Sequence, residues 1–262
     1  MNKILAVGLI MAVASTATYA GQGGFGVGIR AGVAFVKVKG TRIKTVPSTG
    51  NAQDKPLDVG AKPKKTMGQV DLVLDYFCCL ADDWVCGVAL EFGTMLGKAR
   101  GKFKQAGVKL AGKGTASYGA GADDSAVGET TVKQTWHAAL VASVGYRITP
   151  EDTISLGFGG TYANYKVSTV TKLADKDATK QEGFAVIGNK KRRFSPLVQL
   201  QYRHDFGGFY LDGVFRYSFA AKLPSKKVVA PGTSNPPKNG DLAANGGKWQ
   251  AFSLHVGVGK TF

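Results

Sequence analysis

From Phe25 onwards, the sequence alternates between apolar residues and small or polar residues with a period of two. In the first such stretch, Phe25, Val27 and Ile29 alternate with two glycines and Arg30. Successive side chains of a β-strand point to opposite faces, so this period predicts a strand with one apolar face. The same pattern recurs along the chain. The eight predicted strands cover residues 25–36, 70–76, 86–92, 136–148, 154–162, 198–203, 211–219 and 252–262.

The connections between the predicted strands are of two kinds. Three are tight: "ADD" at 81–83, "PED" at 150–152 and "GG" at 207–208. Each length keeps the apolar faces of the joined strands on the same side. Gly207 and Gly208 fit a type I′ turn, which needs positive φ at both positions. The four long connections show little periodicity and cover about 40–66, 97–129, 166–193 and 222–248.

Short turns at one rim and long loops at the other are typical of a transmembrane β-barrel. Closure satisfies every backbone group, and the apolar faces meet lipid. The alternative is a soluble eight-stranded barrel or sandwich, but the polar faces here are mostly Gly, Ala and Ser, which make a poor water-exposed surface. We therefore expect an all-β, eight-stranded, antiparallel, up-and-down transmembrane barrel. Aromatic residues fall at its two rims: Tyr76, Trp84, Tyr146, Phe206, Phe209 and Phe262, and then Phe35, Phe92, Trp136, Tyr162, Phe219 and Phe252.

The N-terminus predicts a secretory signal peptide. Lys3 precedes an apolar core at 4–14 and a stretch of small residues that ends at Ala20. We expect cleavage after Ala20, so that residues 1–20 are the signal and 21–262 the barrel domain. Export permits disulfides.

The three cysteines, Cys78, Cys79 and Cys86, form neither a disulfide framework nor a zinc pattern. With a turn at 81–83, Cys78 and Cys86 stand opposite each other on the outward face. Two states stay open: a cross-strand disulfide, or three reduced cysteines. No cofactor or metal is expected.

The formal net charge of +16 lies in the four long connections, which carry +4, +3, +5 and +4 in chain order. Basic loops attract polyanions. Candidate partners are lipopolysaccharide phosphates, host sulfated glycans and acidic host proteins; loops that are basic only for solubility are the alternative. Nucleic acid is not expected, because no recognition motif is present. The candidate anion-binding residues are Lys62, Lys64, Lys65, Lys98, Arg100, Lys102, Lys104, Lys190, Lys191, Arg192, Arg193, Lys226 and Lys227.

The inward faces of the predicted strands carry charged residues. An eight-stranded barrel is just wide enough for its own side chains, so buried charges must pair. An internal salt-bridge network is expected, and a narrow pore is the alternative. Ser253 and His255 are a weak hint of catalysis, but no motif of a barrel enzyme is present, so no enzyme is predicted. The predicted network is Arg30, Asp71, Asp75, Glu91, Arg147, Arg203, Asp212 and Arg216, with His137, Asp205 and His255 nearby.

The signal peptide, eight amphipathic strands, four long loops and a last strand ending in Phe262 resemble the small outer-membrane barrels of diderm bacteria. These include the OmpA transmembrane domain, OmpX, the opacity proteins and the rickettsial surface adhesins. The resemblance implies a multi-pass monomer in the outer membrane, whose Phe262 is read by the barrel-assembly machinery; Lys260 departs from that signal. It favours a surface adhesin that binds anionic molecules. A structural envelope barrel or a narrow pore is the alternative.

Overall fold

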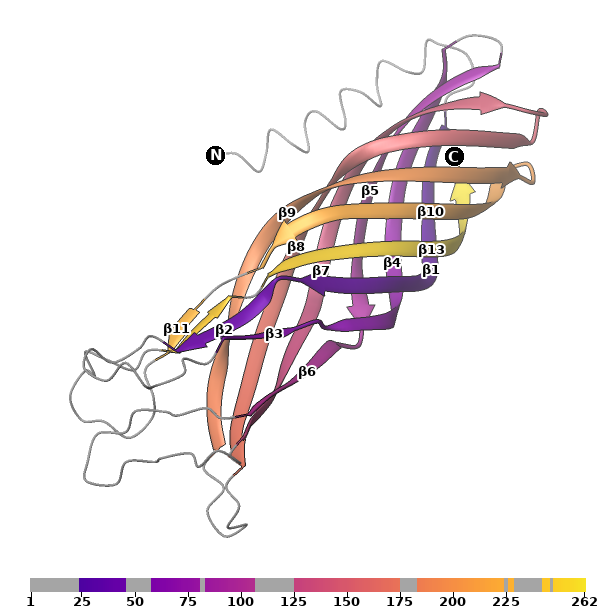
Figure 1. Ribbon diagram of the computed structural model, residues 1–262. Coiled ribbons are helices and arrows are strands. Elements are labelled where there is room, and N and C mark those ends of the chain that lie inside the picture. Colours follow the sequence, from indigo (N-terminus) through magenta and orange to yellow (C-terminus); the bar gives the residue numbers. More distant parts are fainter. Residues whose placement is uncertain are drawn as a thin grey trace, which may run out of the picture.

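The computed structural model describes residues 24–45, 58–80, 83–106, 125–174, 183–223, 226–228, 242–245 and 247–262. The expected signal peptide at 1–20 lies outside these residues. Within them, no helix is long and apolar enough to cross a membrane. The described chain forms a single elongated β-barrel with a small second sheet at one end (Figure 1).

Eight antiparallel strands close the barrel in the order β1-β13-β10-β9-β8-β7-β5-β4. The strand β1 pairs with β13 on one side and with β4 on the other, which closes the sheet. The predicted eight-stranded fold is therefore confirmed. The barrel strands are β1 (Gly24–Lys39), β4 (Lys64–Cys79), β5 (Trp84–Leu96), β7 (Ser125–Arg147), β8 (Asp152–Ala174), β9 (Gly183–Asp205), β10 (Phe209–Lys222) and β13 (Lys248–Thr261).

The tight connections gather at one end of the barrel, which we call the short-turn end. The Gly207 and Gly208 φ angles are 75° and 107°, as the predicted type I′ turn requires. The Asp205 carboxylate accepts hydrogen bonds from both glycine N–H groups, at 3.0 and 3.3 Å. Asp205 therefore stabilises this turn, whereas the alternation of the sequence predicted an interior position for it.

At the other end, which we call the long-loop end, the strands run further than the alternation predicted. The strands β7, β8 and β9 have 23 residues each, about 75 Å at roughly 3.3 Å per residue. A membrane crossing needs only about 9–11 residues. The expected loops at 97–129 and 166–193 therefore contain strand: β6 (Ala99–Ala106) pairs with the start of β7, and β8 pairs with β9 beyond Lys166.

The other two expected loops also contain strands. The second sheet has the order β11-β12-β2-β3. Its strands are β2 (Thr41–Thr45), β3 (Asp58–Ala61), β11 (Lys226–Val228) and β12 (Leu242–Asn245). These strands are three to five residues long, too short for alternation to be recognised, and β2 pairs with β12 from far along the sequence.

The two faces of the sheet exchange their polarity towards the long-loop end. In the first part of β1, Ile29 and Val33 are exposed on the outer face and Arg30 is buried inside. Beyond Phe35, Lys37 is exposed and Val38 is buried. An apolar cluster thus fills the lumen here: Ala34, Val36, Val38, Met67, Met95, Ala99, Val132, Ala163, Tyr165, Val167, Ala221, Leu223, Trp249 and Ala251.

Candidate functional site

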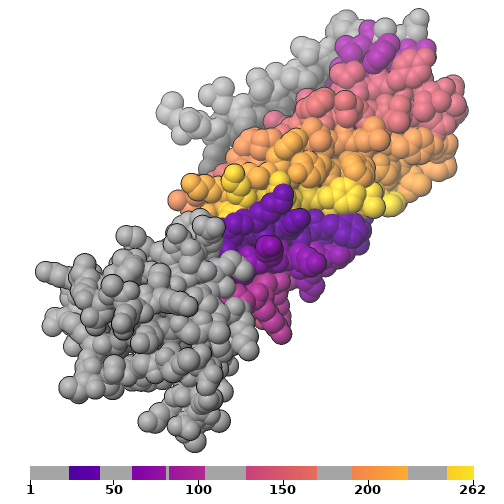
Figure 2. All heavy atoms as spheres, in the orientation of Figure 1, coloured from indigo at the N-terminus to yellow at the C-terminus, as the bar shows by residue number. Residues whose placement is uncertain are grey.

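A belt of apolar side chains surrounds the middle of the barrel on its outer face, and aromatic pairs mark both of its edges. At the short-turn end, the Trp84 and Tyr146 ring centroids lie 5.6 Å apart. At the other edge, Phe35 and Phe252 lie 5.6 Å apart on neighbouring strands. In Figure 2, β1 (indigo) and β13 (yellow) lie side by side on the visible face. The belt includes Ile29, Leu72, Val88, Leu140, Val144, Leu156, Phe158, Leu200, Leu211, Phe215, Leu254, Val256 and Val258.

Inside this belt lies a network of buried charges. The Glu91 carboxylate is fully buried and contacts Arg30 Nη1 and Arg216 Nη2, each at 2.5 Å. Arg30 Nη2 contacts Asp212 Oδ2, also at 2.5 Å. Gln201 donates to Asp212 at 3.0 Å. The four charges come from the three strands β1, β5 and β10 and form a balanced cluster across the lumen.

Two smaller groups flank this cluster. Towards the short-turn end, Arg203 pairs with Asp75 at 3.4 Å, and its guanidinium lies 3.7 Å from the centre of the Tyr210 ring. On the other side, Asp71 contacts His137 at 2.9 Å and His255 at 3.4 Å. The structure thus brings together seven of the eight predicted network residues.

Arg147 is the eighth, and it lies apart from them. Its Nη2 donates to Cys79 Sγ at 3.2 Å, and it lines a cavity of about 130 Å³ at the short-turn end. The alternation of the sequence could not separate Arg147 from the other inward charges. It predicts which face a side chain is on, whereas contact with the network also depends on depth along the barrel axis.

Ser253 and His255, the weak hint of catalysis in the sequence, lie in a tightly packed part of the barrel. Both residues are at least 96% buried. The cavity that Ser253 lines with His137 has a volume of about 20 Å³, far below the roughly 300–1,000 Å³ of ligand pockets. These side chains pack and pair inside the barrel, beneath the apolar cluster.

Basic side chains follow directly above the belt on the outer face, and we call this set the basic collar. Lysines stand directly opposite one another across neighbouring strands: Lys37 with Lys64, and Lys39 with Lys248. The same holds for Lys133 with Lys166. The collar comprises Lys37, Lys39, Lys64, Lys133, Lys166, Arg192, Lys222 and Lys248, all exposed.

The collar is only partly the set that the sequence predicted. Of the predicted residues, Lys62, Lys64, Lys65, Lys98, Arg100, Lys102, Lys191 and Arg192 are exposed at the long-loop end. The side chains of Lys104, Lys190, Lys226 and Lys227 lie outside the described residues. Arg193 is a correction: it pairs with the inward-facing Ala163 and its Nε is buried, so it points into the barrel. The prediction missed six collar residues: Lys37, Lys39, Lys133, Lys166, Lys222 and Lys248. Lys37 and Lys39 follow Phe35 at steps of two residues, which was a usable signal.

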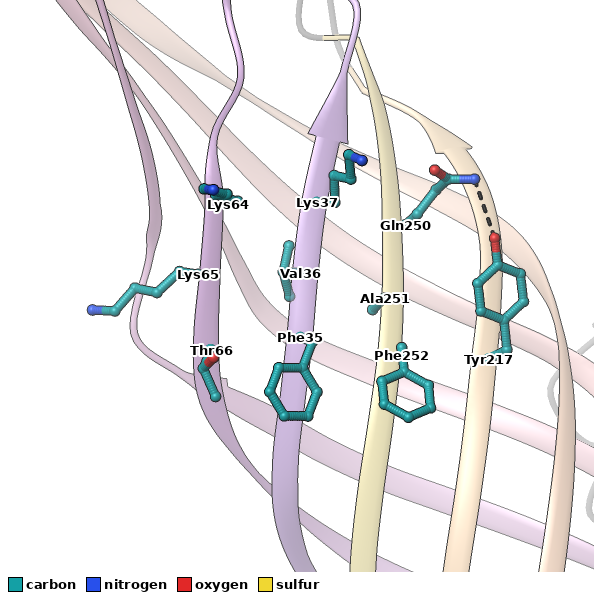
Figure 3. A pocket seen from close by; sticks show the side chains of 10 residues that line it. All are labelled: Phe35, Val36, Lys37, Lys64, Lys65, Thr66, Tyr217, Gln250, Ala251 and Phe252. Carbon is teal, nitrogen blue, oxygen red and sulfur yellow. Dashed lines mark hydrogen bonds between the residues drawn. The ribbon is translucent and has the colours of Figure 1, made fainter.

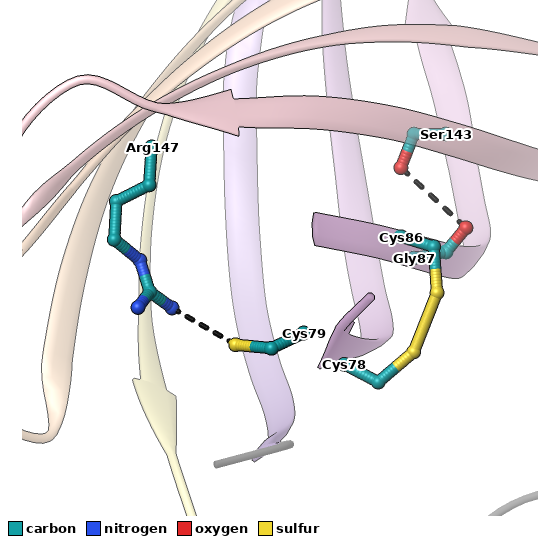
Figure 4. Close-up of a disulfide and its surroundings, with 6 residues drawn as sticks. All are labelled: Cys78, Cys79, Cys86, Gly87, Ser143 and Arg147. Atoms are coloured by element: carbon teal, nitrogen blue, oxygen red, sulfur yellow. Dashed lines mark hydrogen bonds between the residues drawn. A yellow bond between two sulfur atoms is a disulfide. The ribbon is translucent and has the colours of Figure 1, made fainter. Parts of the chain in front are cut away.

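The short-turn end carries a disulfide and a lysine that lies among aromatic rings. Cys78 stands opposite Cys86 with 5.4 Å between Cα atoms, and a disulfide joins them (Figure 4). Lys260 Nζ lies 5.1 Å from the Phe262 ring centre and 5.9 Å from that of Phe209. Such rings attract an ammonium electrostatically, which gives Lys260 a place among the rim aromatics.

Asp152 begins β8 at this end. Hydrogen bonds from Tyr202, His204 and Thr149 lower the pKa of Asp152 to about 2, with the Tyr202 hydroxyl the largest cause. His204 Nδ1 lies 2.7 Å from the same carboxylate. An ionised carboxylate therefore holds these side chains together at the rim.

No family model matches this chain, and no curated protein matches it. Among solved structures, it is similar to the attachment invasion locus protein Ail of Yersinia pestis in complex with the heparin analogue sucrose octasulfate. That match has 11% identity and a TM-score of 0.34, and it covers 91% of this chain and 99% of the other. The outer-membrane protease OmpT of Escherichia coli matches with 10% identity, a TM-score of 0.39 and coverages of 91% and 97%. Neisserial surface protein A matches with 9% identity, a TM-score of 0.29 and coverages of 90% and 97%. At these values, the matches assign no function to this chain.

Proposed function

We propose that this chain is an outer-membrane surface barrel that binds anionic polymers through the basic residues of its long-loop end. The observation that carries the proposal is the sharp change on the outer face from an apolar belt to a basic collar. A continuous apolar surface of this kind is rare on soluble monomers, and lipid is the solvent that suits it. A collar of cations at one edge of the belt then faces water and anions.

The orientation follows from the connections. Outer-membrane barrels carry short periplasmic turns and long exterior loops, so on this proposal the collar lies outside the cell. On this proposal, Phe262 at the periplasmic seam is the residue that the assembly machinery reads. Its backbone N–H donates to the Phe25 carbonyl at 2.8 Å, so the last residue also helps to close the barrel.

The collar favours a polyanion over a small neutral ligand. Like charges directly opposite each other on a sheet destabilise it, and the collar repeats this arrangement on several strand pairs. A bound chain of sulfates or carboxylates would neutralise many such pairs at once. Because exposed charges are screened by salt, with a Debye length of about 8 Å at physiological ionic strength, binding should weaken as salt rises.

The test measures binding of folded protein to immobilised heparin over a series of salt concentrations. A variant with the collar residues Lys39, Lys133, Lys166 and Lys248 all changed to Gln loses four exposed cations. At roughly 0.5 kcal/mol for each exposed contact, we expect about 2 kcal/mol of lost binding free energy, or about 30-fold. Lys260→Gln removes one cation at the opposite end and should leave binding unchanged. Equal binding by the wild type and the fourfold variant would contradict the proposal.

A further inference from the structure

A groove lies on the outer face where the apolar belt meets the basic collar. It crosses β4, β1, β13 and β10 and has a volume of about 690 Å³. Its side chains come from both regions, as the close-up shows (Figure 3). The lining residues are Phe35, Val36, Lys37, Lys64, Lys65, Thr66, Tyr217, Gln250, Ala251 and Phe252.

The strand register arranges the groove in two levels. At the lower level, Phe35 stands directly between Thr66 and Phe252. One pleat higher, Lys37 stands directly between Lys64 and Gln250. The rings of Phe35 and Phe252 lie side by side in Figure 3, beneath the level of Lys37 and Gln250. The groove is therefore apolar towards the belt and cationic towards the collar.

Lys37 and Lys64 both stand at the upper level, and none of the described residues that line the groove is acidic. Lys37 and Lys64 face each other across the strand pair, a position at which opposed Cβ atoms stand about 5 Å apart and like charges repel. Gln250 is already engaged, since its Nε2 donates to the Tyr217 hydroxyl at 3.3 Å. An anion between the two ammonium groups would turn their repulsion into attraction.

We propose that this groove binds one phosphorylated lipid of the outer leaflet. The headgroup phosphate lies between Lys37 and Lys64, and the first part of an acyl chain lies on Phe35 and Phe252. A lipid suits the groove better than a soluble anion, because the lower level opens onto the belt that faces hydrocarbon. This site goes beyond the binding of soluble polymers proposed above, because it lies where the belt that faces lipid meets the collar that faces water.

The test titrates diphosphorylated lipid A into the full-length folded protein in a neutral detergent and counts bound lipids by native mass spectrometry. The groove variant carries Lys37→Gln and Lys64→Gln. With each lysine contributing about fivefold to the attraction of an anionic lipid, we expect about 25-fold weaker binding. The matched control carries Lys62→Gln and Lys102→Gln, two exposed cations outside the groove, and should bind lipid A within twofold of the wild type.

The groove variant is expected to fold, because it removes a repulsive pair and no buried contact; heat-dependent electrophoretic mobility checks this. Equal losses of lipid A in the two double variants would overturn the site, since general basicity would then explain binding. Tight binding of the same phosphorylated disaccharide without acyl chains would also overturn it, because a soluble anion would be the occupant. The heparin test changes collar residues outside the groove, whereas the lipid test changes Lys37 and Lys64 within it, so either proposal can fail alone.

Discussion

The buried charge network makes a strong prediction about Glu91. This carboxylate is fully buried and forms ion pairs with both Arg30 and Arg216. Glu91→Gln keeps the shape of the side chain and leaves Arg30 paired with Asp212. Arg216 loses its carboxylate and keeps the neutral Gln199 Oε1, at 2.7 Å. Removing one partner of a buried ion pair costs about 3–5 kcal/mol, because the remaining charge stays buried and uncompensated. We expect a loss of that size in the free energy of unfolding.

The assay is urea unfolding of the protein refolded into lipid vesicles, followed by the fluorescence of its three tryptophans. Glu129→Gln is the matched control, since Glu129 pairs with Arg100 at 3.5 Å with both side chains partly exposed. Such a pair contributes about 0–1 kcal/mol. The same chemical change should therefore have very different effects at the two sites.

A second variant separates charge balance from packing. Adding Arg216→Gln to Glu91→Gln leaves Arg30 paired with Asp212 and restores a balanced cluster. The double variant should be more stable than Glu91→Gln alone, which a double-mutant cycle measures directly. If Glu91→Gln costs less than about 1 kcal/mol, or if the double variant loses the sum of two independent effects, the reasoning about this network is wrong.

Three further predictions concern the lumen and the short-turn end. Planar-bilayer recordings should show no stepwise conductance, because the apolar cluster around Trp249 and the charge network fill the lumen at two depths; steady open channels would contradict this. Peptide mapping of exported protein should find Cys78 linked to Cys86 before reduction and free after it, whereas free thiols in both conditions would exclude the bridge. Tyr202→Phe should raise the pKa of Asp152 from about 2 towards its usual 3.8, and carboxyl NMR would show it. Because the pKa of Asp152 is lower in the folded protein, its ionised form stabilises the fold at pH values above the unfolded pKa, and this stabilisation is lost as pH falls towards 2. An unchanged pKa in Tyr202→Phe would refute the role of the hydroxyl.

Alternation predicted the barrel strands because, within the belt, each strand has one apolar and one polar face. Leu254 and Val256 are exposed, and Ser253 and His255 are buried, as the period of two requires. The Gly207-Gly208 turn and the pairing of the last strand with the first were also predictable from loop length and closure. These features are local, or follow from the strand count.

The extension of the barrel beyond the belt was not predicted, although the period continues there. In β8, Tyr165 and Val167 are buried, whereas Lys166 between them is exposed. The face that was apolar in the belt is polar here, so a search for one continuous apolar face stops at the change. The pairing of β2 with β12 depends on two distant segments, and no local pattern encodes it.

The most direct test of the membrane-spanning barrel compares the medium around the outer face on the two sides of the belt edge. Single spin labels at Leu254 and at Lys248, both exposed on β13, would be placed in a variant with the three cysteines replaced. In lipid vesicles, collisions with oxygen and with a water-soluble nickel complex report the medium around each label. We expect the label at 254 to collide with oxygen in the hydrocarbon and the label at 248 to collide with the nickel complex in water. A label at 254 that collides freely with the nickel complex would contradict the membrane-spanning barrel.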